Sequence, residues 1–239
     1  MKAVVFFCLI SGLLVVNRVF GQEGEPPSER EIEIAQWNVD HNLRLYQAAI
    51  GLNDLNSAKG ALLNVLVEIP KNDSLLFELG RIYFQLQEYA SAALCAQEVL
   101  KSFPDNIGAL EMAAISFDNI GAKDKAANNY ELLYLKTDNF QSLYKTALLQ
   151  FDLERYKESY NNLSILSGRK EADELTIPAL STANVQKNYP VKVVILNLMG
   201  MIKKDEGDKD EAKRLFNEAL KISPDIASVN ENLTLLNKN

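Results

Sequence analysis

Residues 73–106 of the chain read DSLLFELGRIYFQLQEYASAALCAQEVLKSFPDN, a stretch of 34 residues that decides the fold. If Asp73 is numbered slot 1, apolar residues recur three or four positions apart, as they do on one side of an α-helix. Small residues stand at slot 8, Gly80, and at slot 20, Ala92, and Pro104 at slot 32 marks a helix stop. The stretch therefore predicts two helices joined by a turn near slots 14 to 16.

The same grid of slots fits four further segments, so the molecule is predicted to be a stack of similar parts. These segments are residues 39–72, 107–139, 140–167 and 193–226. The grid slips where Tyr46 takes slot 8 of the first unit and where Gln150 and Lys203 take slot 11 of the fourth and fifth. Asp138 also replaces the proline of slot 32. These departures leave the packing of the first and fourth units open.

The spacing of small residues has a physical meaning. A small residue at slot 8 that faces a small residue at slot 20 lets two helix backbones approach closely, and larger apolar residues fill the space around them. The pattern resembles the tetratricopeptide repeat (TPR) family, whose unit is a pair of antiparallel helices. The resemblance implies an all-α fold, a right-handed α-solenoid of about five helix pairs with capping helices at its N- and C-terminal ends.

The first 21 residues differ in character from the rest. Lys2 is followed by a nearly unbroken apolar run from Ala3 to Val16, which is typical of a secretory signal peptide cleaved before Gln22. An uncleaved membrane anchor is the alternative, but this run is shorter than the ~20 residues that span a bilayer as a helix. We expect residues 22–27 to form a disordered tether, and export to the periplasm or the medium, with a bacterial envelope as the setting.

Residues 28–239 are predicted to form the solenoid. A capping box at Ser28 indicates one long helix from about Glu29 to Leu52, on which Trp37 lies off the apolar side and is expected to make a rim contact. Residues 168–192 form an irregular insert, expected to hold a short helix from about 172 to 187. The insert is either a degenerate half-unit or a flap over the binding groove. A closing helix is predicted over residues 226–237.

Charge and composition exclude several functions. Without residues 1–21 the chain keeps 23 basic and 32 acidic residues, a net charge of −9, which disfavours nucleic acid and anionic membranes as ligands. The remaining cysteine, Cys95, is expected to be buried, and the only histidine, His41, to lie on the surface. The chain has no catalytic, phosphate-binding or metal-binding motif, so we expect no enzymatic activity, no cofactor and no metal.

The resemblance also implies where a partner would bind. In TPR proteins slots 2, 5, 9, 12 and 13 of the first helix of each pair line a concave groove. The hypothesis is that a protein or peptide segment contacts the residues at these slots in the second to fourth units, which are Phe77, Arg81, Phe84, Glu111, Ile115, Tyr144, Leu148 and Phe151. The alternative is that these rings pack against the neighbouring unit and leave no free surface.

The sequence thus favours an exported, non-enzymatic adaptor that binds a protein partner in its groove. The other interpretation is a structural subunit of a larger envelope assembly, which would bind through its convex face and edges. The sequence does not predict an oligomeric state.

Overall fold

The protein is described by a computed structural model over residues 26–238. The predicted signal peptide and residues 22–25 of the predicted tether lie outside the described residues. The elements are α1 (Glu29–Gly51), α2 (Leu55–Glu68), α3 (Asp73–Gln85), α4 (Tyr89–Ser102), α5 (Ile107–Asn119), α6 (Lys123–Thr137), α7 (Phe140–Asp152), α8 (Tyr156–Ser167), α9 (Lys170–Glu174), β1 (Thr176–Leu180), β2 (Gln186–Pro190), α10 (Val191–Asp205), α11 (Lys209–Ile222) and α12 (Ala227–Lys238).

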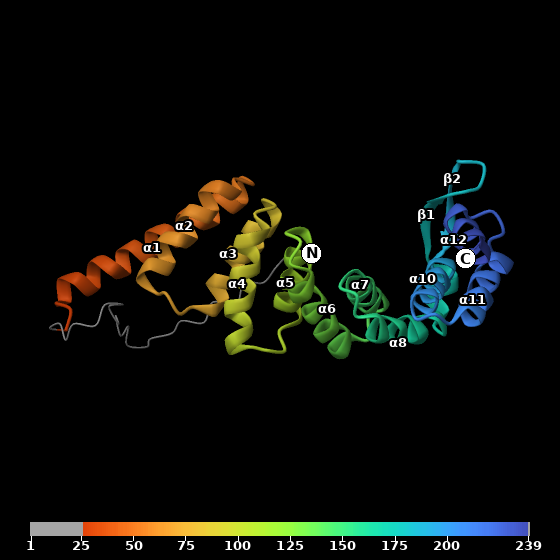
Figure 1. Ribbon diagram of the computed structural model, residues 1–239. Coiled ribbons are helices and arrows are strands. Elements are labelled where there is room, and N and C mark those ends of the chain that lie inside the picture. Colours follow the sequence, from red (N-terminus) through yellow and green to blue (C-terminus); the bar gives the residue numbers. More distant parts are fainter. Residues whose placement is uncertain (1–25, 239) are drawn as a thin grey trace.

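The helices form five consecutive pairs, α1–α2, α3–α4, α5–α6, α7–α8 and α10–α11, and α12 follows the last pair. In each pair the two helices contact each other, and the second helix also contacts the first helix of the next pair. Figure 1 shows the result as an elongated array with α1 at one end and α11 and α12 at the other. The predicted all-α solenoid is confirmed, and α1 and α12 match the long first helix and the closing helix expected from the sequence.

The turn inside every pair has the same backbone geometry. The residue at slot 15 lies in the left-handed region in all five units, with φ between 57° and 84°. Glycine adopts this conformation freely, whereas other residues pay ~1–2 kcal/mol for it. Two of the five are glycines and three are not: Asn53, Gln87, Gly121, Glu154 and Gly207. The predicted chain reversal near slots 14 to 16 is therefore confirmed.

The first helices also begin in a repeated way. At the last position of the preceding unit Asn72, Asn106 and Asn139 act as N-caps, and each Oδ1 accepts a hydrogen bond of 3.0 Å from the backbone N–H three residues later. Such a cap satisfies one of the free amides at a helix start and is worth about 1 kcal/mol. Where proline is missing from slot 32, Asp138 ends α6 by adopting φ 50°, a left-handed C-cap.

Close approach of the helices centres on slot 8. A Cβ added to Gly80 would lie 2.9 Å from Cys95 Cβ, and one added to Gly200 would lie 2.5 Å from Cε1 of the Phe216 ring. Within each pair the nearest atoms thus belong to slots 23 and 24, one turn beyond the expected slot 20, where Ala92 is itself fully buried, and Met112 Cε of the next unit lies as close to the Cβ added to Gly80. Burial raises the pKa of the Cys95 thiol to about 11, so this residue is a packed core side chain.

The polar residues at slot 11 have local partners. Gln150 is 1% exposed, and its Oε1 accepts a hydrogen bond of 2.8 Å from Asn162 Nδ2 in α8. Lys203 forms an ion pair of 2.7 Å with Glu206 and places its ammonium 4.4 Å from the centre of the Tyr160 ring. Both departures from the grid are therefore accommodated without an unpaired charge.

The insert does not hold the helix expected over residues 172–187. Its helix, α9, ends at Glu174, and β1 and β2 form an antiparallel hairpin in which Ile177 pairs with Tyr189. Pro178 lacks the N–H that a helix would need at this position, and alternate residues of β1 are half-buried, as in a strand. The Tyr189 ring is 4% exposed and belongs to the core shared by α7, α8, α10, α11 and α12.

The hairpin is fastened to the start of α12. Asp225 pairs with Lys187 and accepts a hydrogen bond of 3.2 Å from the Tyr189 hydroxyl, and its carbonyl accepts one of 2.7 Å from the N–H of Thr182. The hydrogen bond from Lys187, and then its charge, lower the pKa of Asp225. Meanwhile α10 packs directly on α8, so the stack continues past the insert. Figure 1 shows the hairpin rising beside α10 and α12.

None of the helices between residues 26 and 238 is both long and apolar enough to cross a membrane.

Candidate functional site

The first helices of neighbouring pairs share one side of the array, which we call the first-helix face. On this side α3 contacts α5, and a Cβ added to Gly108 of α5 would lie 2.9 Å from the Phe77 ring of α3. Lys145 of α7 forms an ion pair of 2.9 Å with Asp118 of α5. The face consists of slots 2, 5, 9, 12 and 13 of α3, α5, α7 and α10, so it includes all eight residues predicted to bind a partner.

The predicted residues of α3 differ in how freely they are presented. Phe77 is half-buried because its ring covers Gly108. Phe84 is also half-buried, and its ring packs edge-on against Tyr89 of α4 at a centroid distance of 5.7 Å. Arg81 is exposed, but its guanidinium is already bound by Glu78 at 3.0 Å. Both rings therefore have structural partners and retain part of their surface.

In α5 and α7 the predicted residues range from exposed to buried. Glu111 is exposed, and Ile115 and Leu148 are half-buried beside the core. The Phe151 ring packs against the Tyr156 ring at a centroid distance of 5.6 Å. These two residues stand at the same slots as Phe84 and Tyr89, which form the equivalent contact in the second unit. Tyr144 is 8% exposed and stacks at 6.3 Å on a neighbouring ring of α7, and burial raises its pKa. Tyr144 therefore lies in the core, with little of its ring left for a ligand.

Tyr46, the large residue at slot 8 of the first unit, reaches toward this face. Burial, and then the neighbouring Glu78 carboxylate, raise the pKa of the Tyr46 hydroxyl, while Arg81 acts in the opposite direction. At slot 8, where the second unit carries glycine, the first unit thus carries a tyrosine whose hydroxyl interacts with the Glu78–Arg81 pair of α3.

Ion pairs neutralise two of the charges at the centre of the first-helix face. Arg81 is paired with Glu78, and Asp118 with Lys145, so Glu111 is the exposed acid among the predicted residues that has no ion-pair partner within residues 26–238. Among the predicted residues, the face therefore offers partly exposed apolar side chains and the carboxylate of Glu111. The described part of the chain has no group of three or more His, Cys, Asp or Glu residues placed to hold a metal ion.

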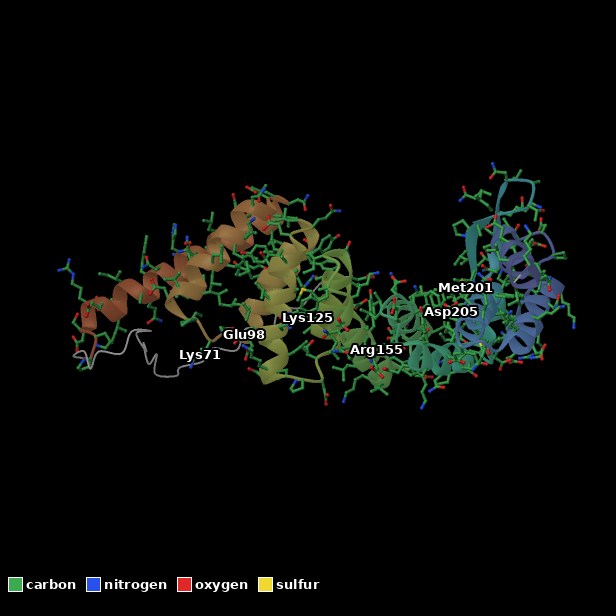
Figure 2. The ribbon with its side chains drawn as sticks, viewed as in Figure 1. Lys71, Glu98, Lys125, Arg155, Met201 and Asp205 are labelled. Atoms are coloured by element: carbon green, nitrogen blue, oxygen red, sulfur yellow. The ribbon has the colours of Figure 1, made fainter. Side chains whose placement is uncertain are left out.

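The fifth unit extends the face beyond the predicted residues. Met201, at slot 9 of α10, is half-buried, and Asp205, at slot 13, is exposed. Both are labelled in Figure 2. The grid of slots could have identified both, because Met201 shares slot 9 with Ile115 and Leu148, and slot 13 is one of the slots expected to line the groove.

Comparisons with known proteins agree with this architecture. Residues 74–106 and residues 193–226 each match the tetratricopeptide repeat family. A comparison with curated protein sequences finds no match.

Solved structures with a similar fold include MamA protein, with a TM-score of 0.53 and 15% identity over 78% of this chain and 92% of that chain. A tetratricopeptide repeat protein from Parabacteroides merdae gives a TM-score of 0.52 and 21% identity over 84% of this chain and 72% of that chain. YrrB, described as a TPR protein with an unusual peptide-binding site, gives 0.57 and 10% over 88% of this chain and 97% of that chain. Identities this low support the fold alone. Two matched repeats within five stacked helix pairs show that the chain is a tetratricopeptide repeat protein, with the fold of a protein–protein interaction scaffold.

Proposed function

We propose that the chain is an exported, non-enzymatic adaptor that holds a segment of another protein on its first-helix face. The observation that carries this proposal is the row of partly exposed apolar side chains on one side of consecutive pairs: Phe77, Phe84, Ile115, Leu148 and Phe151. Helices fix the positions of these side chains, so little ordering entropy is lost when a partner covers them. Tyr144 is left out of the binding set because it is buried.

The charges on this face favour a particular kind of partner. Glu111 is exposed and has no ion-pair partner in the described part of the chain, whereas Arg81 and Asp118 already have theirs. A segment with apolar side chains and a basic residue would cover the apolar row and pair with Glu111. The net negative charge of the chain would also steer basic partners toward it.

Site-specific photocrosslinking in intact cells tests the proposal. A photoreactive residue at position 115 should attach a defined protein, and Glu111→Lys should abolish the attachment without lowering the thermal midpoint. The matched control is position 94, because Leu94 lies in α4, outside the first-helix face, and is 67% exposed. Equal attachment from both positions, or attachment that survives Glu111→Lys, would contradict binding on this face.

A second candidate function has its own support. Large apolar residues are exposed on the second helices, with Val67 at 78%, Leu94 at 67% and Leu135 at 68%. These residues favour a structural subunit that is bound from its outer side. If position 94 crosslinks and position 115 does not, and the protein elutes from a native extract only in a large complex, this function replaces the first.

Export belongs to the same proposal and rests on residues 1–21, which lie outside the described residues. The signal predicts that the protein purified from the cell envelope begins at Gln22. Mass spectrometry of the intact protein, together with fractionation of the cells, tests this directly. A cytoplasmic product that retains Met1 would contradict export and leave binding on the first-helix face untouched.

A further inference from the structure

Helix α1 carries a second, solvent-exposed stripe of mostly apolar residues, which we call the α1 outer stripe. Its members follow one another at intervals of three or four residues, as neighbours on one helix face do. They are all exposed, Leu52 by 82% and Trp37 by 60%. The stripe consists of Ile34, Trp37, His41, Leu45, Ala48 and Leu52.

In the other units, two of the slots that correspond to the α1 outer stripe are buried in contacts between units. Slots 7 and 10 of α3, α5, α7 and α10 are at most 6% exposed, because the second helix of the preceding pair covers them. These residues are Leu79, Ile82, Ala113, Ser116, Thr146, Leu149, Met199 and Ile202. In α1 the same slots are Leu45, which is 44% exposed, and Ala48, which is also exposed. Figure 1 shows α1 at the end of the array. The α1 outer stripe therefore continues the inter-unit contact surface and is shaped to receive one more helix.

The opposite end of the array does not offer that helix. Helix α12 turns Val229 and Leu236 toward the core. Its outer side is largely polar, because only Leu235 is apolar among its exposed residues, which are Ser228, Glu231, Thr234, Leu235, Asn237 and Lys238. A head-to-tail contact between copies would pair an apolar end with a polar one and would generate an open filament.

The charges beside the α1 outer stripe are complementary between two copies of the chain. Asp40 and Arg44 lie one turn apart on the same flank of α1, and both are exposed without an ion-pair partner within residues 26–238. When two copies of α1 pack antiparallel about a two-fold axis near residue 42, the equivalent flanks lie on the same side of the contact. Asp40 of each copy then meets Arg44 of the other, as flanking charges do in a coiled coil.

We propose that the chain forms a two-fold symmetric dimer in which the α1 outer stripes of two copies pack antiparallel, registered by reciprocal Asp40–Arg44 pairs. This joins the two solenoids at their N-terminal ends and leaves both first-helix faces free. It does not depend on the proposed adaptor function.

The mass of the assembly, measured by sedimentation equilibrium, is the primary test. The full chain, as processed by the expressing cell, should be a dimer at micromolar concentration. Leu45→Glu should make it monomeric, whereas Leu94→Glu, the same change on α4, should leave the mass unchanged. The sole tryptophan, Trp37, reports on the same contact, and its emission should shift to shorter wavelength as the dimer forms.

Charge exchange tests the antiparallel register. Asp40→Arg and Arg44→Asp should each weaken the homodimer by about tenfold or more, because like charges then face each other across the axis. Mixing the two variants should restore a heterodimer in which both pairs are attractive. An interaction confined to one helix cannot produce this restoration.

Two results would overturn the proposal. One is a wild-type protein that stays monomeric up to about 100 µM. This result would overturn the proposal even if the protein's own N-terminal residues were found to cover Trp37. The other is a dimer that survives Leu45→Glu with unchanged helicity by circular dichroism. If the dimer forms but the mixed charge variants do not pair, the register is wrong.

Discussion

Replacing Gly200 by alanine tests the close approach between α10 and α11. A Cβ at this position would lie 2.5, 2.8 and 3.0 Å from three carbons of the Phe216 ring, which is fully buried. Overpacking of this kind costs ~1–3 kcal/mol, and separations this short place it at the upper end. Alanine gains back about 1 kcal/mol through its higher helix propensity. We therefore expect a net destabilisation of about 2 kcal/mol.

Gly60 provides the matched control for the same substitution. It lies inside α2, it is exposed, and a Cβ added there would meet no atom within 4 Å. Only helix propensity acts at this position, so Gly60→Ala should stabilise the protein by about 1 kcal/mol. The two changes are chemically identical and are expected to have opposite signs.

Thermal and urea unfolding followed by circular dichroism give both free energies. For a chain of this size 1 kcal/mol corresponds to ~2–4 °C, so Gly200→Ala should lower the midpoint by ~4–8 °C and Gly60→Ala should raise it by ~2–4 °C. In Gly200→Ala, the loss of amide protection from hydrogen exchange should appear first in α10 and α11, because repeat arrays lose stability locally. Phe216→Leu should recover part of the Gly200→Ala loss. A stabilising Gly200→Ala would refute the packing argument.

Three further outcomes are expected. Glu154→Gly should stabilise the protein by up to about 1 kcal/mol and Gly121→Ala should destabilise it by a similar amount, because both stand at the left-handed slot 15; urea unfolding checks both signs. The buried hydroxyl of Ser116 has no hydrogen-bond partner within residues 26–238, so Ser116→Ala should stabilise by about 1 kcal/mol, whereas Ser159→Ala removes a bond of 2.8 Å and should destabilise. The hairpin contacts that lower the pKa of Asp225 stabilise the fold at neutral pH and are lost as pH falls through that pKa, below its ordinary value of 3.8. Exchange of the hairpin amides should therefore rise in acid, and equal acid dependence in Asp225→Asn would contradict this.

Much of the fold could be predicted because each helix pair is specified locally. Spacing at three and four residues, small residues at slots 8 and 20 and a turn near slot 15 all act within one unit or between neighbours. The predicted second unit begins at Asp73, where α3 begins. The repeated caps at Asn72, Asn106 and Asn139 carry the same kind of signal, a short polar residue before an apolar run, and were missed because the slots were assigned on apolar and small residues.

The insert could not be predicted in the same way. The hairpin is held by contacts of Lys187 and Tyr189 with Asp225, 38 and 36 residues further along the chain. The apolar spacing within residues 172–187 fits a helix, and the neighbouring sequence does not indicate the contact with Asp225. Long-range contacts of this kind override local preference.

The candidate site shows the same limit at the level of single side chains. Phe77 and Tyr144 both stand at slot 5 of their units and have similar ring sizes. Phe77 lies at the edge of the core beside the small residue Gly108 and keeps part of its surface, whereas Tyr144 is closed in by core residues from the fourth and fifth units. The slot predicts the side of the helix, and the next unit decides how much of the ring remains exposed.

The direct packing of α10 on α8 makes the insert a detour from the main path of the chain. The polypeptide leaves the stack after Ser167 and rejoins it at Val191, at the position the next unit would occupy in any case. A tag or small domain inserted at the tip of the hairpin would therefore project from the side of the solenoid without changing the pitch or the length of the solenoid. That tip is the natural attachment point for tethering the molecule to a surface.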